Sequence, residues 1–200
     1  MEKRLSSTRT IRKEVPGAQQ VKFATEFKLV IPNELKLYNS EMKELYISKN
    51  LNIELPKSVG KTIHDILNKY LESKLQNLND ENQNNADFTE LEREDTGIKQ
   101  LSSVEMTFYV EVTRAIQTYF NYLLPRCLLV EDENSVEPPD GIGKNEYDQA
   151  YGLEHLMRLF EVLPNYLVNT LRMNQNNSDK VANHMNEFLD WLSKSIDQFK

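Results

Sequence analysis

Apolar residues recur at steps of three and four in four long stretches of the chain, which is the pattern of helices with one buried face. The clearest of these stripes runs from Val104 to Leu123. Ser102 and Glu105 have the spacing of a capping box, which predicts that this helix begins at Ser102. Pro125 should kink or end the helix, because proline has no amide hydrogen to donate.

Three further stripes predict three more helices, the first of them capped by Ser58 or Thr62. Their apolar members are Ile63, Ile66, Leu67, Tyr70, Leu71, Leu75 and Leu78; Tyr147, Tyr151, Leu153, Leu156, Met157, Leu159, Phe160 and Leu163; and Val181, Met185, Phe188, Leu189, Leu192 and Ile196. Helices with one apolar face must bury it against one another. The sequence therefore predicts an all-α fold of orthogonally packed helical hairpins, with a short strand or extended segment over residues 27–31.

A short amphipathic segment follows Pro32. Proline is favoured in the first turn of a helix, so we expect a helix to begin here. The apolar residues that follow at roughly helical spacing are Leu35, Tyr38, Met42, Leu45 and Tyr46. Extended pieces on either side would let this segment pack over the core and leave one edge open.

Charge divides the chain into an arm and a body. Residues 1–22 contain six Lys or Arg and two acids, a net charge of +4, whereas the whole chain carries −7 and the remainder therefore −11. We predict that residues 1–22 are a flexible basic arm and that residues 23–200 form the helical domain. Asn-rich sequence and Pro/Gly-containing sequence predict loops at residues 79–100 and 131–144 within that domain.

The composition argues against several kinds of site. No run approaches the ~20 uncharged apolar residues that a membrane-spanning helix needs. The single cysteine excludes an internal disulfide, and three scattered histidines do not make a zinc site. Cys127 stands among apolar neighbours, so we expect a buried, inert thiol. With no catalytic motif recognised, we expect no catalytic residue, cofactor or metal.

One polar cluster stands out within an apolar stretch. Tyr151, His155 and Arg158 are four and three residues apart, so they share one face of a helix. An aromatic ring, an imidazole and a guanidinium on one face can anchor a loop or another helix by hydrogen bonds. Two interpretations remain open at this point: a structural histidine that joins helices, or the polar edge of a groove for a partner.

Five blocks of the sequence resemble the MRG domain, which is found in chromatin proteins. The blocks are residues 27–36; Leu55–Pro56 with Val59, Ile63, Ile66 and Leu67; residues 115–124; Tyr151–Gly152 with residues 155–160; and, more weakly, residues 186–192. In order and approximate spacing the resemblance extends over residues 23–199. The Asn-rich run at residues 77–85 looks like a lineage-specific insertion and favours a fungal member.

The resemblance implies a non-enzymatic adaptor in the nucleus. MRG proteins are subunits of histone acetyltransferase and histone deacetylase complexes, and their MRG domains bind short segments of other subunits in an apolar groove. Those segments resemble a Phe-x-Leu-Pro motif, alone or beside an amphipathic helix, so contact with chromatin would be indirect. The residues that we predict to bind the partner are Ile31, Leu35, Tyr38, Met42, Tyr46, Tyr151, His155 and Arg158.

Two other classes of function stay open. The basic arm of residues 1–22 would make the chain a nucleic-acid-binding module if its cations neutralised phosphates. The arm has no aromatic residue, and the acidic body favours basic partner segments over direct contact with DNA. An enzyme of unrecognised mechanism would depend on His155 or Cys127.

Overall fold

The computed structural model describes residues 23–48, 55–84, 97–130, 133 and 140–200. The helices of this part are α1 (Asn33–Ile47), α2 (Ile63–Asn84), α3 (Gly97–Leu123), α4 (Leu153–Thr170) and α5 (Gln175–Ser195). Shorter helical turns are η2 (Leu124–Leu128), η3 (Tyr147–Gln149) and η4 (Ile196–Gln198). Within the described residues β-structure is limited to an isolated bridge, so the predicted all-α class is confirmed.

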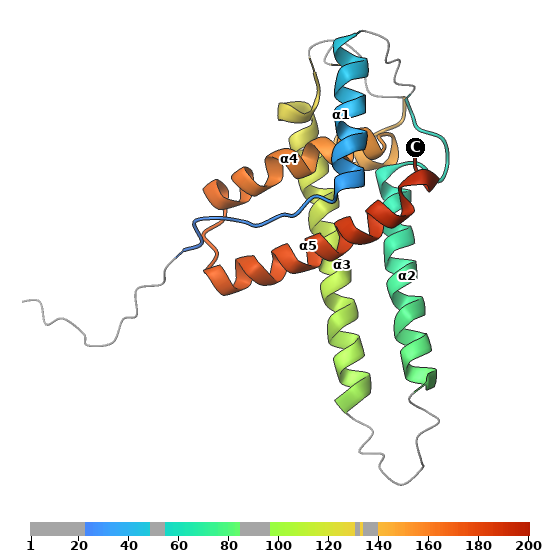
Figure 1. Ribbon diagram of the computed structural model, residues 1–200, viewed down its shortest axis with the longest axis vertical. Helices are drawn as coiled ribbons and strands as arrows, with labels where there is room; N and C mark the ends of the chain where they lie inside the picture. Colours follow the sequence, from blue (N-terminus) through green and yellow to red (C-terminus); the bar gives the residue numbers. More distant parts are fainter. Residues whose placement is uncertain (1–22, 49–54, 85–96, 131–132, 134–139) are drawn as a thin grey trace, which may run out of the picture.

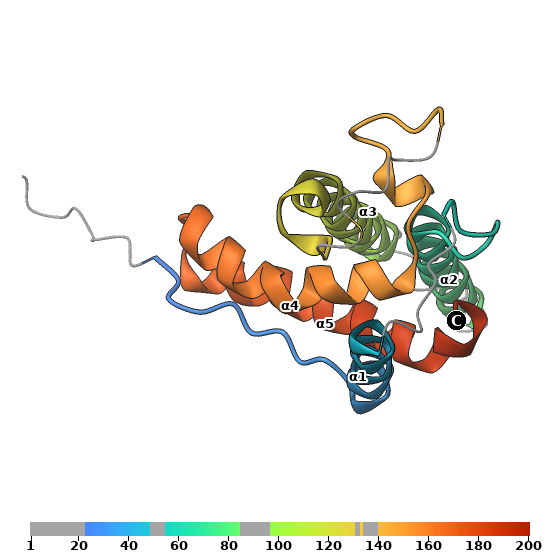
Figure 2. The same ribbon diagram turned by 90° about the horizontal axis from the view of Figure 1, so that it is seen from above.

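Two helical hairpins cross at a steep angle (Figure 1). Helices α2 and α3 run side by side, and the hairpin of α4 and α5 lies across one half of them. Seen from above, α2 and α3 are viewed along their axes whereas α4 and α5 lie lengthwise, which confirms the predicted orthogonal packing (Figure 2). Helix α1 packs against α4 on the side away from α3.

Aromatic rings fill the crossing of the two hairpins. Tyr70 of α2 is fully buried, and its ring centroid lies 5.1 Å from that of Phe188 and 5.3 Å from that of Trp191, both on α5. The ring of Tyr109 on α3 lies 6.0 Å from Tyr70 in an edge-on arrangement. Such edge-to-face pairs add to the free energy of burying the rings themselves. The apolar faces of α2, α3 and α5 therefore meet as the sequence predicts, and Tyr109 and Trp191, which were outside the predicted stripes, join them.

Local hydrogen bonds explain where two of the helices begin. Thr62 Oγ1 accepts from the amide of Asp65 at 3.1 Å, and Asp65 Oδ2 accepts from the amide of Thr62 at 3.2 Å, which is a reciprocal cap before α2. At the start of α5, Asn174 Oδ1 accepts from the amide of Asn177 at 2.9 Å. The cap predicted at Thr62 is confirmed.

The predicted start of α3 and the predicted first loop are wrong in extent. Helix α3 begins at Gly97 rather than Ser102, and α2 continues to Asn84, so part of the expected 79–100 loop is helical. Asparagine costs less than about 0.7 kcal/mol per residue in a helix, and no glycine or proline interrupts residues 63–84. Because this polar run contains no glycine or proline, it can continue the helix that begins in the packed, apolar part of α2.

Residues 27–31 form an extended segment without a partner strand, one of the two outcomes that the sequence allowed. Asn186 of α5 holds it through its side chain, because Asn186 Oδ1 accepts from the amide of Val30 at 2.8 Å and Asn186 Nδ2 donates to the carbonyl of Lys28 at 3.1 Å. Phe27 is buried at 6% exposure. The segment thus lies against α5 before α1 begins at Asn33, with Pro32 as the N-cap residue.

The thiol of Cys127 is exposed, so its predicted burial is wrong. After Leu123 the backbone forms the π-helical turn η2, which contains Pro125, places Leu124 and Leu128 inside and turns Cys127 outward. Partial desolvation still raises the pKa of this thiol, which favours its unreactive protonated form. Among the described residues, no helix combines the length and the apolar character that a bilayer crossing requires.

Candidate partner-binding site

The eight predicted partner-binding residues divide into a buried set and a partly exposed set. Leu35 and Tyr38 have exposures of 0% and 7%, and His155 and Tyr151 of 0% and 3%, so these side chains lie in the core. The partly exposed members are Ile31, Met42, Tyr46 and Arg158. The buried residues can support a binding surface, and only the second set can contribute area to one.

The polar cluster of α4 joins three elements of the fold. Arg158 Nη1 donates to Glu133 Oε2 at 2.6 Å and to the carbonyl of Leu128 at 2.9 Å. His155 Nε2 lies 3.2 Å from Glu133 Oε1, which it contacts as a hydrogen-bond donor when that nitrogen carries the proton. One carboxylate therefore ties the chain beyond η2 to two residues on the same face of α4.

Aromatic rings enclose this cluster from two sides. The ring of Tyr151 lies edge-on to the His155 imidazole, with 4.7 Å between centroids. The guanidinium carbon of Arg158 lies 4.5 Å from the centre of the Tyr46 ring, so α1 covers the other end. The structure thus brings Tyr46, Tyr151, His155 and Arg158 together, and it favours the interpretation in which the histidine joins elements of the fold.

Burial and hydrogen bonding set the ionisation of the cluster. Desolvation lowers the pKa of His155 from its usual 6.5 and keeps the ring neutral. Desolvation opposes ionisation of Glu133, but the hydrogen bonds from His155 and Arg158 outweigh it and lower its pKa to about 2. The cluster is therefore a carboxylate paired with a guanidinium, and the neutral imidazole only orients that carboxylate.

A close backbone contact explains the Tyr151–Gly152 pair. The amide of Ile63 donates to the carbonyl of Tyr151 at 2.8 Å, which draws the start of α4 against the start of α2. A Cβ atom on Gly152 would lie 3.0 Å from the carbonyl oxygen of Lys61. Glycine is required here because the two backbones approach too closely for a side chain.

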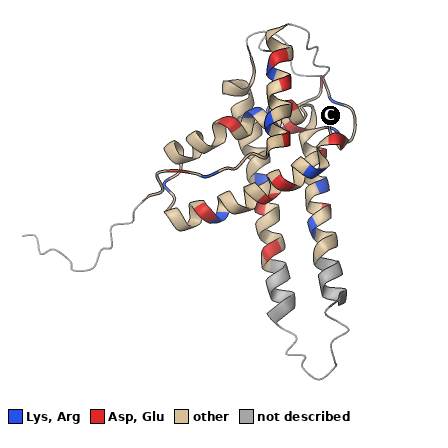
Figure 3. Cartoon of the chain, viewed as in Figure 1, with Lys and Arg blue, Asp and Glu red and all other residues tan. Residues whose placement is uncertain are grey.

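The outer side of α1 carries exposed apolar side chains. Leu37, Leu45 and Ile47 have exposures of 63%, 37% and 83%. At 3.6 residues per turn, Leu45 and Ile47 lie about 80° to either side of Leu37 around the helix axis, so the three side chains form a broad, discontinuous apolar strip over the outer side of α1. Figure 3 shows acids and bases interspersed along the same helix, which leaves this apolar strip with a charged border.

The described contacts do not pair Cys127 with His155. Cys127 Sγ lies 3.7 Å from the carbonyl of Leu123, whereas the imidazole contacts Glu133 and Tyr151. Over the described residues, no three His, Cys, Asp or Glu side chains come together in a group that could hold a metal ion. Cys127 and His155, on which an enzymatic mechanism would depend, therefore contact other residues and not each other.

Comparison with known protein families shows to which family the chain belongs. The sequence model of the family described as MRG matches residues 8–199. The chain belongs to the MRG family. The match includes most of the predicted basic arm as well as the helical body, so the family resemblance of residues 23–199 is confirmed.

Two curated relatives of this MRG chain come from a fungus and a plant. The chromatin modification-related protein eaf3 of Aspergillus fumigatus is 29% identical over 110 residues, which are 50% of this chain and 33% of that protein. Protein MRG1 of Arabidopsis thaliana is 24% identical over 190 residues, 94% of this chain and 51% of that protein. The chain therefore spans about half the length, or less, of these relatives, and its fungal origin stays a prediction.

The sequence analysis did not identify Glu133 as a member of the polar cluster of α4. Glu131, Asp132 and Glu133 follow one another in the sequence, and all three could reach a cation. The only available signal was the need of Arg158 for an acid once the guanidinium lies largely buried, at 15% side-chain exposure. That requirement predicts an acid partner without saying which of the three supplies it.

Proposed function

We propose that this MRG domain is a non-enzymatic adaptor of the nucleus that binds short segments of other subunits in histone acetyltransferase and deacetylase complexes. Membership of the MRG family supports this proposal, as does the name of its relative eaf3, a chromatin modification-related protein. Phe-x-Leu-Pro-like or amphipathic helical segments are the expected ligands. Contact with chromatin then passes through those subunits.

The observation that carries the proposal is the exposed apolar strip of α1. Leu37, Leu45 and Ile47 leave apolar side-chain area exposed to water on the side of α1 that does not pack on α4. A partner segment that covers such area gains about 25 cal/mol for each Å² removed from water. Apolar helix faces of this kind are common docking surfaces for short segments of other proteins.

The partly exposed residues of the predicted site border this strip. Met42 and Tyr46 lie at the edge where α1 packs on α4, and Ile31 lies just before the helix begins. Methionine and tyrosine adapt to different partners because one is flexible and the other combines an apolar ring with a hydroxyl. Leu35, Tyr38, Tyr151 and His155 hold the helix in place beneath them.

A binding measurement with a matched control tests the proposal. The probe is a labelled peptide of about ten residues that contains a Phe-x-Leu-Pro motif, titrated into the full chain. Leu37→Asp/Leu45→Asp should weaken binding at least about tenfold, because both carboxylates would be buried against an apolar ligand. The control Val59→Asp/Leu75→Asp adds the same charge at residues that are 98% and 49% exposed, and it should bind normally.

Two results would overturn the proposal. Equal binding by both double variants would remove the strip of α1 from the interface. Loss of DNA binding on deletion of residues 1–22, together with no binding of any peptide, would favour the nucleic-acid module instead. Affinity purification from nuclear extract, with the α1 variant as control, then tests whether acetyltransferase or deacetylase subunits depend on this strip.

A further inference from the structure

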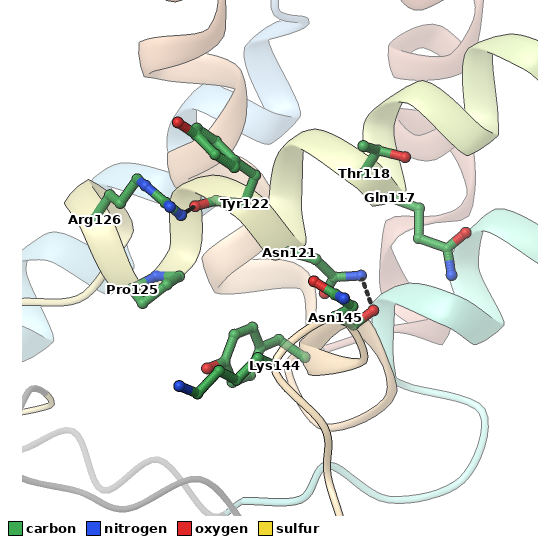
Figure 4. Close-up of a pocket in the computed structure, with 9 residues that line it drawn as sticks. Gln117, Thr118, Asn121, Tyr122, Pro125, Arg126, Lys144 and Asn145 are labelled. Carbon is green, nitrogen blue, oxygen red and sulfur yellow. Dashed lines mark hydrogen bonds between the residues drawn. The ribbon is translucent and has the colours of Figure 1, made fainter.

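A second surface, away from α1, is positively charged although the net charge of the chain is negative. A cleft of about 880 Å³ lies between the C-terminal turns of α3 and the segment that leads into η3 (Figure 4). Figure 2 places this segment and α1 on opposite sides of the molecule. The residues that line the cleft are Gln117, Thr118, Asn121, Tyr122, Pro125, Arg126, Lys144, Asn145 and Tyr147.

Among the described residues, the lining contains two cations and no carboxylate, in a chain whose net charge is −7. Neither Arg126 nor Lys144 forms an ion pair with any residue that the structure describes. Both side chains are exposed at the mouth of the cleft. Unpaired cations that face each other across a cleft attract an anionic group more strongly than either does alone.

Contacts with Tyr122 fix the orientation of the Arg126 guanidinium. It stacks on the Tyr122 ring, with 3.7 Å from the guanidinium carbon to the ring centre, and its Nη1 donates to the Tyr122 carbonyl. The remaining N–H groups have no acceptor among the described residues. A planar guanidinium fixed in this way loses little side-chain entropy when a carboxylate binds its free edge.

Two acids that the structure describes beside the cleft are engaged by other groups. Asp148 lies beneath the cleft with 0% exposure, and its carboxylate accepts from Gln117 Nε2 and Asn121 Nδ2, both at 2.7 Å. It also lies 3.4 Å from His64 Nδ1. Glu146 turns back on its own loop, where its Oε2 accepts from the amide of Gly143 at 3.1 Å.

We propose that this cleft binds an acidic peptide segment of a partner protein. Carboxylates of the segment pair with Arg126 and Lys144, and an aromatic or proline residue between them lies on the apolar area of Tyr122 and Pro125. The Asn145 side-chain amide, which forms no hydrogen bond with a described residue, faces the cleft and can bind the peptide main chain. The volume accommodates several residues of a peptide rather than a single small anion.

Charge-matched variants test this proposal with a defined probe. The probe is the labelled peptide Glu-Asp-Phe-Pro-Asp-Glu, acetylated and amidated, and its control replaces each acid by the corresponding amide. The acidic peptide should bind and shift NMR signals of residues 117–126 and 144–147, and the neutral peptide should bind at least about tenfold more weakly. Arg126→Glu/Lys144→Glu should reduce binding of the acidic peptide by a similar factor.

The control variant Lys36→Glu/Lys180→Glu changes the net charge by the same amount at exposed positions elsewhere and should bind within about twofold of the original chain. Equal weakening by both variants, or equal binding of both peptides, would overturn the proposal. Competition by inorganic phosphate at the peptide's own concentration would show a small-anion site instead, and binding of duplex DNA that depends on Arg126 would show a nucleic-acid surface. The Phe-x-Leu-Pro probe should bind Arg126→Glu/Lys144→Glu normally, so this proposal and that for α1 fail separately.

Discussion

The guanidinium of Arg158 lies between Glu133 and the ring of Tyr46, and so couples α1 to the chain that follows η2. Its Nη1 reaches Glu133 Oε2 at 2.6 Å, while its carbon lies 4.5 Å from the centre of the Tyr46 ring. Both interactions need a flat cation of fixed orientation. Arg158 therefore positions the C-terminal half of the helix that carries the proposed binding strip.

Substitution of Arg158 should destabilise the fold before it affects any single contact with a partner. Arg158→Gln leaves the Glu133 carboxylate, at 14% side-chain exposure, without its cation, and we expect a loss of about 2–3 kcal/mol in the free energy of unfolding. Urea denaturation measures this loss. Arg114→Gln, at a side chain that is 66% exposed, is the control and should change little. Similar losses in the two variants would remove the special role of Arg158.

The helical stripes could be predicted because each element obeys a local rule. Thr62 precedes an apolar stripe and caps it, and α3 ends at Leu123, two residues before Pro125. The ends next to the Asn-rich run were misjudged because Asn only weakly disfavours a helix, and tertiary packing outweighs that preference. Boundaries without a glycine, a proline or a cap carry little local information.

The site was only partly predictable, because a stripe gives the direction of a side chain but not what covers it. Leu35 and Leu37 both lie on α1, yet packing on α4 buries the first and leaves the second 63% exposed. The partner of His155 depended on a contact 22 residues away in sequence, to Glu133. The proposed acidic-peptide cleft is lined by both Arg126 and Lys144, which are far apart in the sequence, and no spacing rule predicts that they line the same cleft.

The two faces of α1 should respond differently to truncation. Leu35→Ala opens a cavity at a fully buried residue, and we expect it to cost about 2–5 kcal/mol in unfolding free energy. Leu37→Ala should change stability by less than about 0.5 kcal/mol but weaken binding of the Phe-x-Leu-Pro probe. Thermal denaturation and the peptide titration, performed on both variants, separate these effects. A destabilised Leu37→Ala variant would mean that this residue belongs to the core.

Acid should destabilise the domain in two steps. Since burial lowers the pKa of His155 below 6.5, the unfolded chain binds a proton there that the folded chain does not. The stability associated with the neutral ring is complete above 6.5 and falls as the pH decreases from that value toward the lowered pKa. The carboxylate of Glu133 contributes stability above its usual 4.5, which is lost as the pH falls to about 2.

Urea denaturation over a range of pH measures both steps. His155→Gln keeps a donor for Glu133 but has no titrating ring, so its stability should change less than that of the original chain between about pH 7 and about pH 5. The later loss, below about pH 4.5, should remain in this variant. Parallel profiles of the two proteins down to about pH 5 would contradict the neutral, buried state of the imidazole.

The extended segment before α1 should loosen when the side chain of Asn186, which bridges two of its residues, is removed. Asn186 bonds both the amide of Val30, at 2.8 Å, and the carbonyl of Lys28, at 3.1 Å, so Asn186→Ala removes two hydrogen bonds at once. We expect a loss of about 1–2 kcal/mol and faster hydrogen exchange at the Val30 amide. Asn183→Ala, at an exposed position one turn earlier on α5, should leave that exchange unchanged. If exchange at Val30 is equally fast in both variants, contacts of Phe27 and the start of α1 hold the segment without Asn186.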